Sequence, residues 1–444
     1  MKYLLFTSLL LWYMTCSAGA KEKQPNIIIL FVDDYGWSHV GYRNATYHTP
    51  NLAQLKREGM EFTRAYVPTP TCSPSRASLL TGKEAIRMEM PRHIPHEHPD
   101  GSNSSKYSYW ETDPSHTPSI NWLPLEEVTY AESLANGGYT NYFIGKWHLG
   151  HEPYHPIHQG FDDQFGTSNF GHPRSYYPPY FNNSDVLKDT PSDKYLTDNL
   201  TDRAVEFLEN YDKTKPFQLS FWYYNVHGPH EGPKELVGKY LDRGMPKAEA
   251  NYAAMVEAMD TSVGRIKEAV EKNGLAENTI IFLISDQGGL FSNAPLSGGK
   301  RGGNTLGEGG ARVPFIVWYP EMIEAGSVFT DPIQTIDVYP TLMDIAGLKG
   351  NDNKDINGIS LLPALKGESL PKRNLYFYRA YEDQYAAIIR GPWKLKKYRS
   401  GKVELYNIDE DISETHDLVE SEKKMTRALA NSLAEWEKEA VPFK

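Results

Sequence analysis

Unbroken apolar runs alternate along this chain with segments of helical periodicity. Residues 26–32 (NIIILFV) form an apolar run typical of a strand buried on both faces of a parallel sheet. Similar strands are predicted at residues 139–144, 217–226 and 279–285, and helices between them at 51–58, 129–136, 192–211 and 247–272. The alternation predicts an α/β fold with a large, mostly parallel central sheet flanked by helices.

The pattern changes near residue 375 to short β-rich segments, which are followed by an amphipathic helix at 420–439. This predicts a smaller antiparallel sheet with a packed helix. We place a catalytic domain at residues 21–370 and a C-terminal α+β subdomain at 371–444, with a linker near 366–373. A single continuous domain is the alternative and differs little in function.

The first 20 residues have the features of a signal peptide: Lys2, an apolar run at 4–14 and an Ala-Gly-Ala ending. The run is too short to span a bilayer, which needs about 20 residues, so a membrane anchor is disfavoured. Lipidation at Cys16 is also disfavoured by the residues before it. We expect cleavage near Ala20, a secreted or periplasmic protein, and no membrane span.

Cleavage removes Cys16 and leaves Cys72 as the one cysteine, so no intramolecular disulfide is expected. The net charge of −11 argues against a general nucleic-acid binder, whose affinity rests on a basic surface. An anionic substrate would therefore need a local cluster of cations.

Polar groups follow four of the predicted strands directly. They are Asp33-Asp34, the GKWH segment 145–148, the HGPH segment 227–230 and the DQG segment 286–288. In open α/β sheets, ligands bind outside the carboxyl ends of the strands, so these groups are expected to converge. Each alone could be a helix cap or a loop residue. Four such coincidences favour a site.

Asp33, Asp34 and Asp286 offer carboxylates, and Gln287 offers an amide oxygen. Oxygen ligands with high negative charge suit a hard cation, so we predict one Ca²⁺ per chain, with Mg²⁺ second. Zinc is less consistent with this set because several histidines would be expected. Cys72, in modified form, is counted with these ligands.

Residues 72–82 read CSPSRASLLTG and place Cys72 directly before a predicted helix. A thiol at a helix N-terminus is expected to be activated, because the unpaired N–H groups and the dipole favour negative charge there. The alternative is a buried structural cysteine beside a helix cap.

The segment resembles the signature of the type I sulfatases, Cys-x-Pro-Ser-Arg followed by a leucine-rich turn. Further segments look like landmarks of that family in family order: TPNL 49–52, GKWHLG 145–150, GFDD 160–163, GGK 298–300, EGGARVP 308–314, TIDVYPTL 335–342 and ELYNIDED near the C-terminus. The resemblance implies an alkaline-phosphatase-like fold and sulfate ester hydrolysis. It also implies formylglycine, made from Cys72 by a formylglycine-generating maturation enzyme.

The resemblance implies further roles by matching position. Arg76 and His148 would contact the formylglycine, and Lys146, Lys300 and His230 would hold the sulfate. Gln287 departs from the family, where the residue after the aspartate is usually Asn or His. His227 has two open readings: it contacts the ligand or orients His230.

Chemistry supports these roles independently. A hydrated aldehyde has two hydroxyls, and a nearby cation lowers the pKa of one so that it attacks sulfur. His230 and Lys300 are the candidate acids for the leaving alcohol. The second hydroxyl then loses its proton to His148 and expels sulfate, while cations stabilise the charge on the sulfuryl oxygens.

A long segment at 86–127, rich in His, Pro and aromatic residues, is expected to form part of a substrate wall. We assign Arg92 and His93 in it to substrate binding. A metal cluster of Arg92, His93, His96 and His98 is disfavoured because no helical spacing supports it. Segment 171–180 (GHPRSYYPPY) would form another wall, with Arg174 meeting a carboxylate or a second sulfate.

Secretion and aromatic walls favour a sulfated carbohydrate as the substrate. The GGK and EGGAR spacing looks similar to branches that act on galactose or N-acetylgalactosamine sulfates. Two other classes stay open: a phosphonate or phosphate diester hydrolase of the same superfamily, and a catalytically silent glycan-binding protein. An intact metal set together with all the cationic side chains argues against the silent protein.

Overall fold

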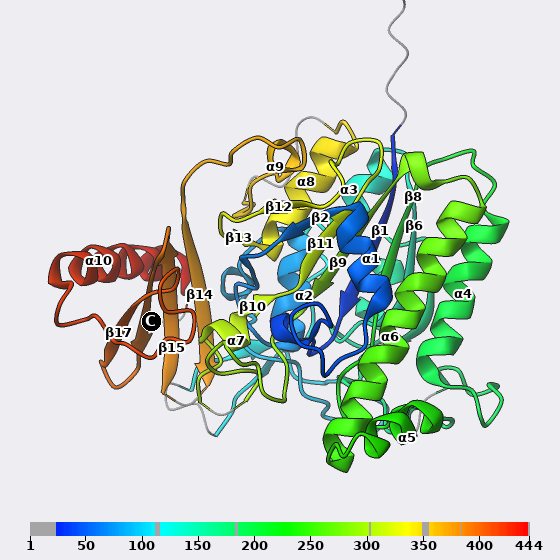
Figure 1. Ribbon diagram of the computed structural model, residues 1–444, viewed down its shortest axis with the longest axis horizontal. Helices are drawn as coiled ribbons and strands as arrows, with labels where there is room; N and C mark the ends of the chain where they lie inside the picture. The colour runs from blue at the N-terminus through cyan, green and yellow to red at the C-terminus, as the bar shows by residue number, and fades with distance from the viewer. Residues whose placement is uncertain are drawn as a thin grey trace, which may run out of the picture.

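An eight-stranded sheet runs through the centre of the computed structural model, which describes residues 24–111, 116–182, 185–301, 303–348, 355–381 and 383–442 (Figure 1). In spatial order the strands are β12 (Ser327–Phe329), β2 (Met60–Phe62), β11 (Phe315–Trp318), β9 (Thr279–Ser285), β1 (Asn26–Val32), β8 (Phe217–Trp222), β6 (Thr140–Lys146) and β7 (Asp163–Ser168). The predicted signal peptide, residues 1–20, lies outside the described residues.

Most neighbours in this sheet are parallel. β1 pairs in parallel with both β8 and β9, and β6 pairs in parallel with β7 and β8. Strand β11 runs antiparallel to β9 and β2. The prediction of a mostly parallel sheet is therefore confirmed.

Helices cover both faces of the sheet because the side chains of its buried strands alternate between two apolar cores. Ile27, Ile29 and Phe31 of β1 pack into one core with α2 (Cys72–Thr81), α3 (Tyr130–Asn136), α8 (Val338–Ile345) and α9 (Leu362–Leu365). Ile28 and Leu30 pack into the other with α1 (Pro50–Glu58), α4 (Leu196–Asn210), α5 (Lys234–Asp242) and α6 (Lys247–Lys272). The sheet is thus held rigidly between two layers.

The C-terminal residues form a second sheet beside the first (Figure 1). It is an antiparallel meander of β14 (Asn374–Tyr381), β15 (Gln384–Arg390), β16 (Trp393–Tyr398) and β17 (Val403–Asn407). Helix α10 (Lys423–Ala440) packs on it through Leu429, Leu433 and Trp436. The predicted antiparallel sheet with a packed helix is present, and the boundary at 371 stays a prediction.

Short elements connect these layers. They are β3 (Ala65–Tyr66), β10 (Arg312–Val313) and β13 (Ile333–Gln334) in one small sheet, β4 (Tyr107–Ser108) with β5 (Ser119–Ile120) in another, and α7 (Glu308–Ala311). Among the described residues, no helix combines the length and apolarity that a membrane crossing needs.

Two predicted elements are shorter than expected. Strand β8 ends at Trp222 and not at 226, because the chain beyond it turns to bond with the backbone of Asp33. The amide of Asp33 donates to Asn225 O at 2.8 Å, and Val226 N donates to Asp33 O at 2.6 Å. Helix α4 begins at Leu196, whose amide bonds to Tyr176 O, and not at 192.

Candidate active site

The predicted polar groups meet at one edge of the large sheet. Asp33 and Asp34 follow β1, His148 lies two residues beyond β6, and Asp286 follows β9. Asp34 and His148 have left-handed backbones, with φ of 58° and 55°. Non-glycine residues adopt this conformation at a cost and are concentrated at functional sites.

Three buried carboxylates form the floor of the site. The backbone N–H of Asp34 donates to Asp286 Oδ1 at 3.0 Å, and the Asp33 and Asp286 side chains are fully buried. Burial and the neighbouring Asp33 charge raise the pKa of Asp286 well above its usual value. Burial also raises the pKa of Asp34. Burial therefore disfavours the charged form of Asp34 and of Asp286.

Asp33 is the exception because cations surround it. Burial alone would raise the pKa of Asp33, but Lys146, His227, Arg76 and Lys300 together hold it well below its usual value. Lys146 Nζ bonds to Asp33 Oδ2 at 2.5 Å, and Arg76 Nη2 bonds to Asp286 Oδ2 at 3.0 Å. Arg76 and Lys146 are fully buried and do not line the cavity described below. These two cations hold the carboxylates of Asp33 and Asp286 in place by hydrogen bonds from outside the cavity.

Cys72 is the first residue of α2 and faces the carboxylates. Its Sγ lies 3.8 Å from Asp33 Oδ1 and accepts a hydrogen bond from Gln287 Nε2 at 3.2 Å. The expectation of an activated thiol is wrong here. Burial raises the pKa of Cys72 to about 12, an effect larger than that of the nearby Lys146. The sulfur is held as a neutral thiol, which fits a precursor better than a nucleophile.

His148 is fixed in one tautomer. Its Nε2 lies 2.9 Å from the carbonyl oxygen of Ile94, which only accepts, so Nε2 carries the proton. Nδ1 is buried and has no hydrogen-bond partner among the residues described. Burial and Lys146 hold the pKa of His148 well below its usual value. His148 therefore presents a neutral nitrogen with a free lone pair.

Gly171 packs against the ring of His148. A Cβ at position 171 would come within 2.7 Å of His148 Cε1, closer than such contacts occur. Glycine is thus needed at this position for the observed placement of the ring.

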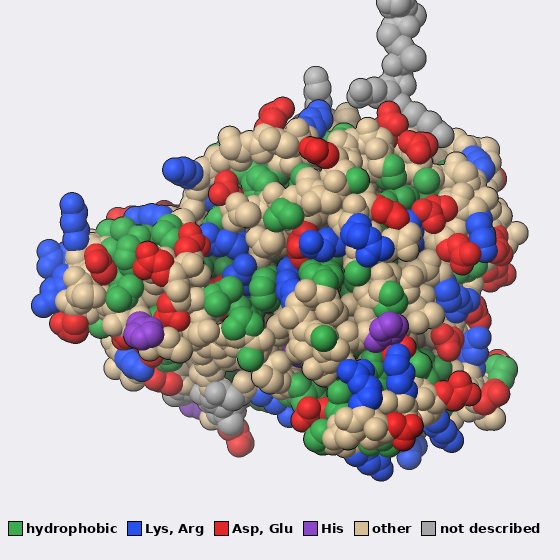
Figure 2. Space-filling view, in the orientation of Figure 1, with side chains coloured by type: hydrophobic (Ala, Val, Ile, Leu, Met, Phe, Trp, Pro, Cys, Tyr) green, Lys and Arg blue, Asp and Glu red, His purple; other side chains and the backbone are tan. Residues whose placement is uncertain are grey.

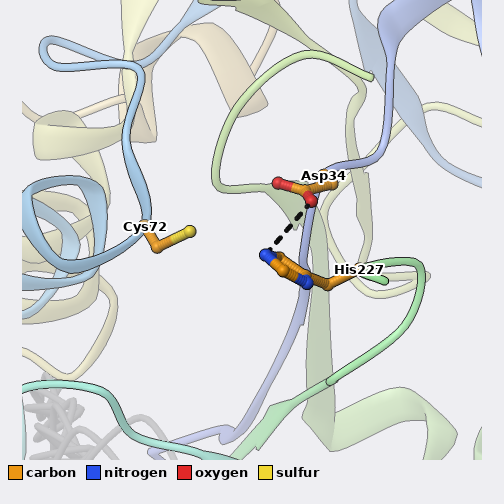
Figure 3. Close-up of side chains that lie close together, drawn as sticks. All are labelled: Asp34, Cys72 and His227. Carbon is orange, nitrogen blue, oxygen red and sulfur yellow. Dashed lines mark ion pairs between the residues drawn. The ribbon is translucent and has the colours of Figure 1, made fainter. Parts of the chain in front are cut away.

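The structure separates the two histidines of the HGPH segment. His227 Nε2 lies 3.7 Å from Asp34 Oδ2, and Lys300 Nζ bonds to the same oxygen. Figure 3 shows His227 and Asp34 facing each other with the Cys72 side chain directed toward them. His230 instead packs on Tyr252 and Phe291, with ring centroids 5.5 Å and 5.2 Å away. The structure thus does not bring His230 to the site, and His227 occupies the place expected for it.

The donor set fits a divalent cation. Two groups of side chains could each hold a metal ion. Within each group the ligand atoms lie within 4.8 Å of one another; one group is Asp33, Cys72 and Asp286, and the other is Asp34, Cys72 and His227. A bound Ca²⁺ would favour the ionised forms of Asp34 and Asp286, which burial disfavours. Gln287 Nε2 points at Asp34 Oδ1, at 2.8 Å, so its amide must turn for the oxygen to ligate.

A cavity of about 560 Å³ opens over Cys72. Its lining residues are Thr71, Cys72, His93, Ile94, Pro95, His96, His148, Gly171, His172, His227, Gln287, Lys300, Arg301, Gly303, Thr305, Arg379, Tyr381 and Gln384. The segments at 86–127 and 171–180 both contribute to the wall, as expected. His93 is in this set.

Two residues assigned to substrate binding lie elsewhere. Arg92 is fully buried, and its Nη2 donates to the carbonyls of Ser108 and Thr117 at 3.1 and 2.5 Å. It closes the β4–β5 hairpin and does not line the cavity. Arg174 is exposed, donates to Asn182 Oδ1 at 2.8 Å and is also outside the lining.

Several lining residues were missed from the sequence, namely Thr71, His172, Arg301, Arg379, Tyr381 and Gln384. Arg379 and Tyr381 end β14, and Gln384 begins β15. The alternating apolar and polar residues of these two segments predict strands, and nothing in that alternation indicates a binding site. Arg301 was detectable, because it directly follows the Gly-Gly-Lys landmark.

Comparison with known proteins gives the family. Residues 25–348 match the family described as Sulfatase, and residues 304–439 match N-sulphoglucosamine sulphohydrolase, C-terminal. N-acetylgalactosamine-6-sulfatase of Mus musculus is 32% identical over 407 residues, which span 85% of this chain and 72% of that protein. Arylsulfatase G of Rattus norvegicus is 29% identical over 82% of this chain and 72% of its own length.

Solved structures agree. Ps i-CgsB, solved in complex with k-i-k-neocarrahexaose, is 31% identical to this chain, and the match covers 93% of each chain with a TM-score of 0.80. The phosphonate monoester hydrolase of Agrobacterium radiobacter, 18% identical with a TM-score of 0.64, shares the fold. The predicted alkaline-phosphatase-like α/β fold is thus confirmed, and the chain belongs to the sulfatase family, whose members hydrolyse sulfuric esters.

Proposed function

We propose that this protein hydrolyses a sulfate ester on a saccharide and releases inorganic sulfate. One observation carries the proposal. Cys72 begins α2, faces three buried carboxylates and opens into a cavity lined by Lys300, Arg301 and Arg379. No carboxylate is among the described residues that line this cavity. The relatives named for N-acetylgalactosamine 6-sulfate support a sulfated sugar as the substrate.

Two groups complete the site in this proposal. Formylglycine, made from Cys72 by a maturation enzyme, supplies a hydrated aldehyde whose hydroxyl is the nucleophile. Asp33, Asp34, Asp286 and, with its amide turned, Gln287 would hold one Ca²⁺, which would supply positive charge to the site.

The chain's own residues then act around these groups. Lys300 binds the sulfuryl oxygens, since it lines the cavity and carries a positive charge there. His148 accepts a proton at Nδ1, the nitrogen that its bond to Ile94 leaves free. Arg76 holds Asp286 in place, and Lys146 holds Asp33 in place and favours its ionised form.

His227 takes the acid role in place of His230. It lines the cavity, and its Nδ1 is tied at 2.7 Å to the carbonyl of Gly228, which turns Nε2 toward Asp34. Because the Gly228 carbonyl only accepts, Nδ1 carries the proton of the neutral ring, so His227 acts as an acid once Nε2, beside Asp34, has taken up a second proton that it can pass to a leaving alcohol. We further propose export, with cleavage near Ala20, because residues 1–20 have the features of a signal peptide.

The direct test uses a sulfate and a phosphate ester of one alcohol. Protein produced with a formylglycine-generating enzyme should release sulfate from sulfated galactose or N-acetylgalactosamine substrates much faster than phosphate from the matching phosphate esters. A dominant phosphate rate would favour the rival diester hydrolase. Cys72→Ala should abolish the sulfate release, and activity that survives it would refute the role of Cys72.

A further inference from the structure

The C-terminal sheet supplies one wall of the cavity. Arg379 and Tyr381 lie at the end of β14, and Gln384 begins β15, more than 300 residues after Cys72 in the sequence. All three line the space that opens over the Cys72 side chain. The wall is therefore built by a part of the chain that holds neither the carboxylates nor the nucleophile.

Arg379 is held in place on this wall from two sides. Its Nη1 donates to Pro70 O at 3.1 Å and to the hydroxyl of Thr71, and these residues directly precede Cys72. Its guanidinium lies over the ring of Tyr381, 4.0 Å from the centroid. The side chain is only 9% exposed. A guanidinium fixed in this way loses little entropy when it binds a ligand.

The charge on this wall comes from arginine and not from histidine. Burial, followed by the nearby Arg379, lowers the pKa of His93 to about 3, so its ring is neutral. Lys300 is already paired with Asp34. Arg379 is thus a fixed positive charge away from the Asp34 pair.

Arg301 adds a second, adjustable charge at the same cavity. It is exposed and has no hydrogen bond or ion pair with any residue that the structure describes. On the face shown in Figure 2, positive and negative side chains are interspersed, whereas the described residues that line the cavity include cations and no carboxylate. A cavity of about 560 Å³ also exceeds the size of a single sulfate group.

We propose that Arg379, assisted by Arg301, binds a second anionic group of the saccharide, either another sulfate or a sugar carboxylate. The inference rests on the proposed function and deepens it, because it makes polyanionic saccharides the preferred substrates. A guanidinium donates charge-assisted hydrogen bonds to the oxygens of either anion. The sulfate that is cleaved stays with Lys300 and the carboxylate-bound cation.

The test compares kcat/KM on one disaccharide in three forms: singly sulfated, doubly sulfated, and singly sulfated with a uronic carboxylate. Wild type should prefer at least one of the dianionic forms, and the form that it prefers identifies the anion. Arg379→Gln should lower that preference roughly ten- to a hundredfold. Arg379→Lys should retain part of it. Because the preference is a ratio within each variant, losses of folded or matured enzyme cancel.

Arg390→Gln is the matched control, since Arg390 lies on the adjacent strand β15 and bonds to Asn374 and Ser432 away from the cavity. Its preference should equal that of wild type. An unchanged preference in Arg379→Gln would overturn the inference. If kcat/KM falls equally on all three substrates, Arg379 serves the cleaved sulfate or the fold; if kcat/KM does not fall, Arg379 binds neither anion.

Calorimetric binding of the same disaccharides separates the two proposals. If wild type releases no sulfate from any form, the proposed function fails. The second-anion site then stands if Arg379→Gln still weakens binding of the dianionic form more than the monoanionic one, and falls if it does not. If sulfate is released and the preference does not depend on Arg379, only the inference fails.

Discussion

Two histidines lie three residues apart after β8, and their surroundings predict different roles. His227 lines the cavity 3.7 Å from Asp34, whereas His230 packs on Tyr252 and Phe291. His227→Ala should lower kcat/KM for a sulfated saccharide by ~10²- to 10⁴-fold, the range for a general acid or base. His230→Ala should lower it by less than about tenfold. Steady-state sulfate release measures both.

The opposite ranking would return the acid role to His230. A pH profile adds a second criterion, since loss of a catalytic acid changes its shape and loss of packing does not. Both variants should keep the thermal unfolding temperature within a few degrees of wild type.

The ring of His148 can be displaced without changing its chemistry. In Gly171→Ala, the added methyl group would meet His148 Cε1 at 2.7 Å, so the ring must move away from the position where Nδ1 accepts a proton. A shift of about 1 Å in a catalytic group can cost ~10²-fold in rate. We expect a loss of kcat of that order, measured at saturating substrate.

Gly238→Ala is the control for this substitution. Gly238 lies within α5, and a Cβ there meets nothing within 4 Å. Its kcat should equal that of wild type. Full activity in Gly171→Ala would show that catalysis does not depend on the present position of the His148 ring.

At the scale of elements, a buried ion network ties the loop that carries Lys300 to the C-terminal sheet. Lys394 of β16 bonds to Glu308 at 2.8 Å and lies 3.2 Å from Glu414, and all three side chains are fully buried. Glu414 accepts a bond from the amide of Glu308 at 2.7 Å and another from Ser297 Oγ. The 297–308 loop thus depends on residues of the second sheet.

Lys394→Met should therefore cost about 3–5 kcal/mol of stability, because it removes the buried cation that both carboxylates share and leaves Glu308 only with Arg312 at 3.3 Å and Glu414 only with Lys396 at 3.5 Å. Chemical denaturation of the purified protein measures the loss. Lys397→Met on the same strand removes only a partly exposed pair with Glu437 and should cost less than about 1 kcal/mol. Similar losses in both variants would contradict a special role for the buried network.

The strands that carry the site were predictable because they are buried on both faces. The sequence of such a strand is an apolar run. The polar residue that follows the run marks the carboxyl end of the strand, as Asp33 and Asp286 do. The placement of His227 was not predictable, since the turn after Trp222 decides which histidine faces Asp34.

The burial of Cys72 and the position of Arg379 could not be predicted from the sequence either. The motif around Cys72 shows a helix start, which favours a thiolate, but the burial that raises its pKa to about 12 comes from distant segments. Arg379 reaches the cavity only because β14 packs beside Pro70 and Thr71, a long-range contact that no local pattern encodes. Arg92 and Arg174 failed as wall residues for the same reason.

For the whole molecule, the buried carboxylates predict stabilisation by a divalent cation. Calcium binds only the folded site, so saturating Ca²⁺ should raise the unfolding temperature of chelator-treated protein by on the order of 5 °C. Magnesium should raise it less, because these oxygen ligands suit the larger ion. Differential scanning calorimetry measures both shifts.

Asp34→Asn provides the comparison, since it removes one charge from the cluster and keeps the shape of the side chain. Its Ca²⁺-induced shift should be clearly smaller than that of wild type. Equal shifts in the two proteins would place the bound calcium elsewhere.

The central claim is that Cys72 becomes the nucleophile of a sulfate ester hydrolase by conversion to formylglycine. The most direct measurement relates the sulfate release rate to the converted fraction of Cys72. That fraction is read by mass spectrometry of the tryptic peptide from Ala65 to Arg76 in preparations made with and without a maturation enzyme. The rate should rise in proportion to the converted fraction and vanish with the thiol form. A thiol form that releases sulfate as fast as the converted one would contradict the account.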